Sequence, residues 1–200
     1  TKNLLDAKPE DRKFYEVITN NCNTYADLEW TDMSIFEDDI INSFTNLFSK
    51  VFSKIDDGFN KEIFDYKWSI SSDDKKKSLH FNHTGGVSCW SKVEEQGVFW
   101  KYFKKKLYNS KDEFPEFFYL VKEGDKLVEK CVIDFAVYTK NRMWRTIFSH
   151  KHGSNRILKP CTQYLDLIEE EEVEIEDYLS SREYKDYYKY YELPKHLKNI

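Results

Sequence analysis

Residues 25–30, YADLEW, place two carboxylates one residue apart in an aromatic and otherwise apolar run. On a β-strand, residues i and i+2 project from the same face, so Asp27 and Glu29 would stand side by side while Leu28 points the other way. Two like charges so close together repel each other unless a cation lies between them. The run therefore predicts a strand with one apolar face and one acidic face that is suited to a cation.

A helix is predicted directly after this strand. The four residues 34–37, SIFE, have the S-x-x-E pattern of a capping box, which begins a helix. Apolar side chains then recur at every fourth position, as is typical of an amphipathic helix that packs on a flat surface. They are Ile40, Phe44, Phe48 and Phe52. We expect this helix to end near Asp57-Gly58.

The rest of the chain predicts an α+β fold. Period-two patterns predict strands at 61–71, 75–83, 126–139 and 143–150, and a second helix is predicted at 91–108. The resulting order is strand, helix, strand, strand, helix, strand, strand, which is the split βαβ pattern of ferredoxin-like and RRM-like antiparallel sheets with packed helices. A loop and a short helix over residues 165–181 would close a domain spanning 1–181. We expect a tail or a linker helix toward a following domain over 182–200.

Composition excludes several classes of protein. No apolar run approaches the roughly 18 residues of a membrane span, and the first residues lack the apolar core of a signal peptide. The four cysteines are far apart and form no C-x-x-C pair, so neither a zinc knuckle nor a disulfide framework is predicted. We expect an intracellular protein without a membrane partner, and the nucleus, the mitochondrion and a viral replication site are not distinguished.

The net charge of −5 hides a basic segment. Residues 161–200 hold five Lys or Arg and eleven Asp or Glu, so that residues 1–160 carry a net charge of about +1. Between Asp134 and Lys159 the chain has six basic residues and no acid other than Asp134 itself. They are Lys140, Arg142, Arg145, Lys151, Arg156 and Lys159. Such a stretch is able to hold phosphates.

A third acid, Asp134, lies in the apolar run CVIDFAV at residues 131–137, which predicts a buried strand. If this strand lies beside the YADLEW strand, Asp27, Glu29 and Asp134 converge, and their hard oxygen ligands suit Mg²⁺ or Mn²⁺. Two such ions stabilise in-line displacement at phosphorus. Because D-x-E pairs are common, two surface acids on a half-exposed strand remain the alternative interpretation of the spacing alone.

Two further pairs show i, i+2 spacing. Ser78 and His80 follow three lysines on a predicted strand, so a hydroxyl and an imidazole share one face where a phosphate would fit. An exposed Ser and a hydrogen-bonded His form the alternative interpretation. His150 and His152 adjoin Gly153, and we interpret them as part of a turn rather than as metal ligands.

Five blocks of the sequence together carry a resemblance. They are FYEVI (14–18), DLE (27–29), KKSLH (76–80), VIDFAVYTKNRMWR (132–145) and SHKHG (149–153). In this order they resemble the catalytic core of the archaeo-eukaryotic primase superfamily, most closely the eukaryotic primase-polymerases (PrimPol) and the primases of large eukaryotic DNA viruses. That family has a D-x-E or D-x-D pair, an S-x-H motif and a late acid after hydrophobic residues. The likeness covers about residues 13–160, and its extended third block is far more specific than the acids.

The resemblance implies a two-metal catalytic site and a polymerase substrate. Asp27, Glu29 and Asp134 would bind two divalent ions, Mg²⁺ or Mn²⁺. Nucleotides from (d)NTPs would be transferred to a 3′-hydroxyl on a single-stranded DNA template, with or without an annealed primer. The choice between NTPs and dNTPs stays open, and a fused or associated helicase would be a further partner.

The resemblance also implies which residues bind the nucleotide. Ser78 and His80 would contact the triphosphate of the incoming nucleotide, assisted by Lys76. The third block has basic positions that hold the triphosphate or the template strand. The matching residues here are Arg142, Arg145 and Lys151.

The chain departs from the family pattern in three places. Met143 stands where a polar Asn would be expected. Only 26 residues precede Asp27, so we expect the N-terminal module of such enzymes to be short or truncated. No Cys/His zinc module follows the core, so extension of a primer is expected to survive more readily than its initiation.

Two other functions are compatible with parts of the pattern. A non-catalytic RRM-like module would bind single-stranded nucleic acid through exposed aromatic residues in a K/R-G-F/Y-G/A-F-V-x-F/Y run, and the sequence contains no such run. A metal-dependent nuclease would use the same three acids. That reaction needs no triphosphate site, so it would leave Lys76, Ser78 and His80 unexplained.

Overall fold

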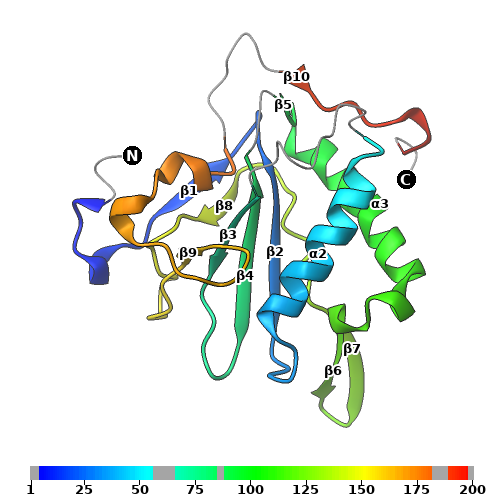
Figure 1. Cartoon of the computed structure of the whole chain (residues 1–200), viewed down its shortest axis with the longest axis horizontal. Helices are drawn as coiled ribbons and strands as arrows, with labels where there is room; N and C mark the ends of the chain where they lie inside the picture. The colour runs from blue at the N-terminus through cyan, green and yellow to red at the C-terminus, as the bar shows by residue number, and fades with distance from the viewer. Residues whose placement is uncertain (1–4, 56–65, 85–87, 182–188, 198–200) are drawn as a thin grey trace.

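A four-stranded antiparallel sheet lies at the centre of the protein (Figure 1). In spatial order its strands are β2 (Thr24–Trp30), β4 (Lys77–His83), β3 (Tyr66–Ile70) and β9 (Lys159–Cys161). This computed structural model describes residues 5–55, 66–84, 88–181 and 189–197. The predicted α+β class and antiparallel pairing are confirmed, and residues 61–65 of the predicted strand 61–71 lie outside the described residues.

The free edge of β2 is extended by a short piece of chain. Ile133 forms a bridge with Leu28, the Glu29 amide donates to the Val132 carbonyl at 2.7 Å, and the Asp134 amide donates to the Asp27 carbonyl at 2.9 Å. The strand predicted over 126–139 is therefore wrong in its extent. Its first part is β7 (Lys126–Cys131), which pairs with β6 (Phe118–Glu123) in a separate hairpin that projects from the molecule (Figure 1).

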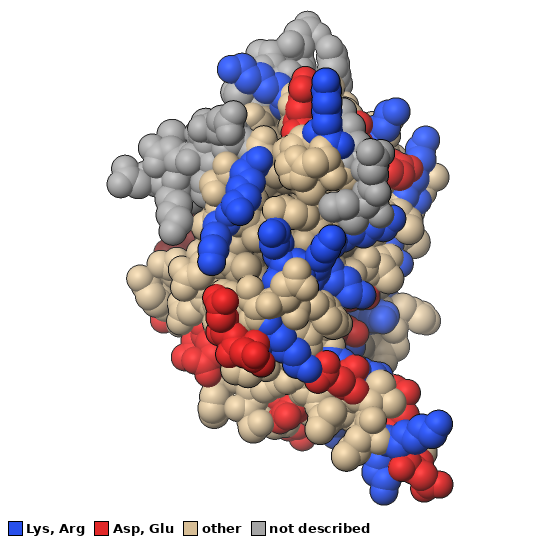
Figure 2. Space-filling view, turned by 90° about the vertical axis from the view of Figure 1, so that its right-hand side faces the viewer, with Lys and Arg blue, Asp and Glu red and all other residues tan. Residues whose placement is uncertain are grey.

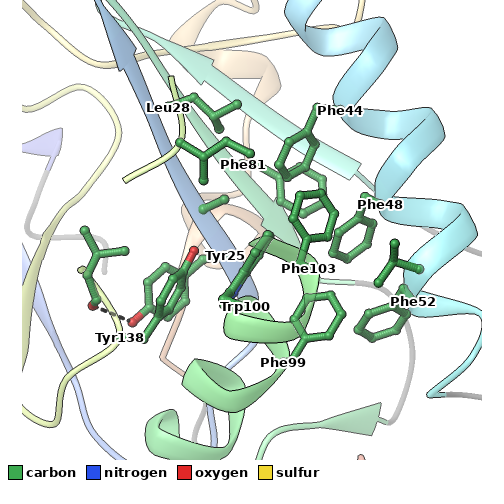
Figure 3. Close-up of a cluster of buried hydrophobic side chains, with 14 of the residues drawn as sticks. Tyr25, Leu28, Phe44, Phe48, Phe52, Phe81, Phe99, Trp100, Phe103 and Tyr138 are labelled. Atoms are coloured by element: carbon green, nitrogen blue, oxygen red, sulfur yellow. Dashed lines mark hydrogen bonds between the residues drawn. The ribbon is translucent and has the colours of Figure 1, made fainter. Parts of the chain in front are cut away.

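Two helices cover one face of the sheet. They are α2 (Glu37–Phe52) and α3 (Val93–Asn109). Figure 3 shows the rings of Phe44, Phe48 and Phe52 from α2 turned toward rings from α3. Phe44 and Phe48 also lie 4.9 and 5.0 Å, centroid to centroid, from the ring of Phe81 on β4. The fourfold spacing in the sequence thus corresponds to the buried face of a helix, and aromatic contacts of this kind make the largest contribution to such a core.

The predicted capping box does not form. Phe36 is the N-cap residue of α2 and makes no side-chain capping bond, and Ser34 instead donates its hydroxyl to Asp32 Oδ1 at 2.6 Å. A Ser two residues after an Asp satisfies that Asp locally in a turn, which removes it from the helix N-terminus. The described part of the helix ends at Phe52, and Asp57-Gly58 lies outside the described residues.

A two-stranded ribbon covers the other face of the sheet (Figure 1). In it β1 (Tyr15–Ile18) pairs with β8 (Arg142–Arg145), with Tyr15 opposite Arg145. The strand predicted over 143–150 is thus shorter, and it belongs to this ribbon rather than to the central sheet. The chain turns at residues 147–148 and again at 152–153, where Gly153 has a φ of 77°. The turn interpretation is therefore confirmed for His152, whereas His150 forms a bridge with Ile157.

The remaining elements are short. They are η1 (Pro9–Asp11), β5 (Ser88–Cys89), η3 (Lys111–Glu113), η4 (Pro115–Phe117), η5 (Glu170–Glu172), η6 (Ile175–Tyr178), β10 (Lys189–Tyr190) and η7 (Lys195–Leu197). A helix over 182–200 is wrong for Lys189–Tyr190, which pairs with β5, and residues 182–188 and 198–200 lie outside the described residues. Among the described helices, none has the length and apolar composition needed to cross a bilayer.

Candidate active site

The register of β2 and β4 brings the two i, i+2 motifs together. Asp27 lies directly opposite His80, and Glu29 lies directly opposite Ser78. Neighbours such as Leu28 and Leu79 are fully buried on the helix side, so the acids, the hydroxyl and the imidazole share the opposite face. The carboxylate pair in YADLEW therefore belongs to a polar face that is built across two strands.

Asp134 reaches this face from the free edge of β2. Its backbone bonds to Asp27, but its side chain turns back and Oδ1 accepts a hydrogen bond from the Ala136 amide at 2.8 Å. An Asp that accepts from the amide two residues later begins a turn, so the chain leaves the sheet at this point. The prediction that Asp134 lies within a buried strand is wrong for this reason, whereas its position beside the strand of Asp27 and Glu29 is confirmed.

The three acids interact electrostatically. The pKa of Asp27 is raised to about 7, chiefly by burial and also by the charges of Glu29 and Asp134, while Lys76 and Arg145 oppose the change. Asp27 Oδ1 is buried and has no hydrogen-bond partner among the residues that the structure describes. A buried carboxylate oxygen without a partner is costly unless a cation or a donor satisfies it.

These acids fit a divalent cation in their chemistry. Within the described ranges, no three His, Cys, Asp or Glu side chains are already grouped as metal ligands. Glu29 is engaged by Lys76, whose Nζ lies 2.6 Å from Oε2, and Asp134 is engaged by the Ala136 amide. The unsatisfied oxygen of Asp27 and a set of carboxylate ligands nevertheless match what Mg²⁺ and Mn²⁺ prefer.

His80 is a neutral imidazole in a buried position. Its pKa is lowered to about 3, chiefly by burial and also by the nearby charge of Arg145. Its Nε2 lies 3.7 Å from Asp27 Oδ1, which is too far for a hydrogen bond, and the neutral ring forms no ion pair. The ring packs against Trp144 with a centroid distance of 4.4 Å. Because Nδ1 has no partner in the described part of the chain, this imidazole retains hydrogen-bonding capacity.

A pocket of about 190 Å³ lies over this polar face. Eight of the nine site residues predicted from the sequence line it: Asp27, Glu29, Lys76, Ser78, His80, Arg142, Arg145 and Lys151. The ninth, Asp134, lines a neighbouring pocket that shares Glu29 and Lys76 with the first. The sequence prediction therefore identified a set of residues that the fold gathers in one place.

Four residues of the pocket are not among the nine site residues predicted from the sequence. They are Tyr15, Met143, Trp144 and Arg156. Arg156 belongs to the basic stretch already noted, so its charge was the available signal, whereas Tyr15 enters only because β1 pairs with β8. Arg145 donates to Ser71 Oγ at 2.8 Å and to the Arg156 carbonyl at 3.1 Å, which fixes its guanidinium at the pocket wall.

No family model matches the chain, and no curated protein matches it either.

Proposed function

We propose that this chain is a metal-dependent nucleotidyltransferase. One observation carries the proposal: the β2–β4 register sets Asp27 opposite His80 and Glu29 opposite Ser78, on the face that Asp134 borders. Ligands for cations and donors for phosphate thus lie within one small pocket. Within this class, the proposed activity is that of a DNA primase or primase-polymerase core of the archaeo-eukaryotic primase superfamily, because its three motifs occur here in order.

The incoming (d)NTP would place its triphosphate against the basic wall of the pocket. Arg142, Arg145 and Lys151 supply the positive charge that a triphosphate requires, and a guanidinium offers paired planar donors. Neutral His80 and the Ser78 hydroxyl would add hydrogen bonds to phosphate oxygens. A nuclease needs no such wall, so the basic residues favour nucleotide transfer.

The acids would hold the cations that neutralise the reacting phosphate. Divalent ions bound here would act as Lewis acids at phosphorus and bring the 3′-hydroxyl into line. For this Asp27 must be ionised, and Lys76 must release Glu29 and take up a phosphate oxygen instead. The contribution of the chain is then mainly positioning and charge neutralisation.

Incorporation of labelled NTPs and dNTPs on single-stranded DNA templates, primed and unprimed, tests this proposal. Assays with Mg²⁺ and with Mn²⁺ should give templated products, and Asp27→Asn and Glu29→Gln should each reduce the rate by at least about a hundredfold. Asp38→Asn, which changes an exposed acid at the start of α2, is the matched control and should retain full activity.

The outcomes separate the candidate functions. Products from bare template would indicate a primase, and products from primed template alone would indicate a polymerase that extends. Degradation of the template that depends on Asp27 would support the nuclease instead. No incorporation together with intact binding of single-stranded DNA would contradict the proposal and favour the RRM-like binding module.

A further inference from the structure

A second and larger pocket adjoins the candidate active site. Its volume is about 790 Å³, and it lies between the edge of β2, the helix α3 and the β6–β7 hairpin. Glu29 and Lys76 line both pockets, whereas Asp27, Ser78 and His80 line only the smaller one. Asp134 lines only the larger one. The carboxylates therefore stand at the boundary between two separate spaces.

The walls of the larger pocket combine aromatic rings with lysines. Lys104 on α3 lies 5.5 Å from the ring centroid of Tyr108 and 5.3 Å from that of Phe135, and it forms no ion pair with any described residue. The hairpin adds Tyr119 and Lys130. Figure 2, which views the α3 side of the molecule, shows Lys and Arg side chains spread over its middle.

This combination suits a nucleic acid strand. Aromatic rings stack on bases whatever their sequence, and lysines follow the phosphates. A pocket of this volume has room for about two nucleotides rather than for a duplex, on the general scale of small-molecule sites. Lys104, and Lys130 once it leaves its ion pair with Glu123 at 2.7 Å, would offset the negative charge of a strand in this pocket.

In-line displacement determines which end of the strand would occupy the pocket. The attacking hydroxyl must approach phosphorus from the side opposite the leaving pyrophosphate. If the basic wall of the smaller pocket takes the triphosphate, the hydroxyl comes from the side of Asp134 and Glu29, which is the larger pocket. This step rests on the function proposed above.

We infer that the pocket between α3 and the β6–β7 hairpin binds the 3′-terminal nucleotides of the strand that is extended. The rings of Tyr108 and Phe135 stack on its bases, Lys104 and Lys130 contact its phosphates, and its terminal hydroxyl lies against Glu29 and Asp134. Tyr108, Lys104 and Lys130 lie outside the five blocks of the sequence that carry the resemblance, whereas Phe135 lies in the third block, next to Asp134.

Fluorescence anisotropy with a short 5′-labelled single-stranded oligonucleotide tests the site. In EDTA and without nucleotide, Lys104→Ala combined with Tyr108→Ala should raise the Kd at least about tenfold, because one stacking contact and one phosphate contact are lost. Lys105→Ala is the matched control, since this neighbouring lysine of α3 is exposed but does not line the pocket, and it should change the Kd less than about twofold. Binding of a fluorescent nucleotide with Mn²⁺ is measured on the same variants and should not change.

Two isomeric oligonucleotides test the polarity. An unlabelled strand with a 3′-phosphate should compete several-fold less well than the same strand with a 5′-phosphate, because its extra charge would meet Glu29 and Asp134. Equal competition, or equal losses in the Lys104 and Lys105 variants, would overturn the inference while nucleotide binding leaves the proposed function standing. Pocket-dependent strand binding without any nucleotide binding would support the strand site and contradict the polymerase proposal.

Discussion

The ionised form of Asp27 is disfavoured in the candidate site. Its pKa rises to about 7 because the side chain is largely withdrawn from water and because Glu29 and Asp134 lie nearby. A carboxyl group with a raised pKa binds its proton more tightly in the folded than in the unfolded protein. Its contribution to stability is therefore greatest at low pH and falls as pH rises from 3.8 toward about 7.

Asp27→Asn should stabilise the protein where Asp27 is ionised. Without divalent ions, we expect the Tm to rise by several degrees at about pH 8 and to change little at about pH 4.5, since a pKa change of this size corresponds to a few kcal/mol. Thermal unfolding followed by circular dichroism at both pH values measures the effect. Asp38→Asn on the exposed surface is the control, and an equal gain at both pH values for Asp27→Asn would contradict the explanation.

His80 should act as a neutral hydrogen-bonding group throughout the physiological range. Its pKa is lowered to about 3, so its stabilising effect is complete above pH 6.5 and is lost as pH falls toward 3. We expect His80→Ala to weaken nucleotide binding about tenfold, by the same factor at about pH 6 and at about pH 8. Titration with a fluorescent nucleotide checks this, and a loss confined to pH 6 would indicate an imidazolium instead.

At the scale of elements, β8 links the candidate site to the core. Trp144 is buried with a ring centroid 4.4 Å from that of His80 and 4.7 Å from that of Tyr25, while its neighbour Met143 is 62% exposed. The alternation along this strand therefore directs one side chain onto the polar face of the sheet and the next toward solvent.

Trp144→Ala should destabilise the protein by about 3 kcal/mol or more and also weaken nucleotide binding, because it opens a cavity beneath His80. Met143→Ala on the same strand should change stability by less than about 0.5 kcal/mol. Urea unfolding of the two variants measures the difference. A stability loss for Trp144→Ala with unchanged nucleotide affinity would show that the strand has no part in positioning His80.

The elements also show where sequence patterns succeed. The periodicity of α2 indicates which of its side chains are buried, and the alternation in β2 and β4 indicates which side chains share a face, because both depend on the local repeat of a helix or a strand. The pairing of β8 with β1 and the separation of the β6–β7 hairpin from the sheet have no such local signal. Strand partners depend on which edges the rest of the fold leaves free, so the extent of the predicted strand 126–139 was wrong.

At the scale of the whole molecule, Glu16 joins the beginning of the chain to a distant segment. Its carboxylate accepts hydrogen bonds from the amides of Ser180 and Ser181 at 2.8 and 2.7 Å and from the Ser181 hydroxyl at 2.6 Å. The Ser180 hydroxyl in turn donates to Asn82 Oδ1 on β4 at 2.6 Å. Asn82 lies two residues from His80 on β4, and Glu16 is next to Tyr15, so this network lies close to the candidate pocket that His80 and Tyr15 line.

Glu16→Ala should weaken the attachment of Ser180 and Ser181 to β1. Two backbone amides would lose their acceptor, and we expect a loss of about 2 to 3 kcal/mol together with faster hydrogen exchange at residues 178–181. Hydrogen exchange followed by mass spectrometry locates the effect, and Glu10→Ala, an exposed acid of η1, serves as the control. Unchanged exchange at these residues would show that other contacts hold the segment.

The sequence by itself predicted the α+β class, an amphipathic helix followed later by a second helix, and, through the family resemblance, nine site residues, because periodicity and motif spacing are local properties. The tertiary structure decided which of these residues meet. The register of β2 and β4 sets Asp27 opposite His80. The free edge of β2 brings Asp134 beside them. The β1–β8 ribbon adds Tyr15 and Trp144 to the wall of the pocket. These are contacts between residues far apart in the chain, and their geometry follows from how the elements pack rather than from any repeat within them.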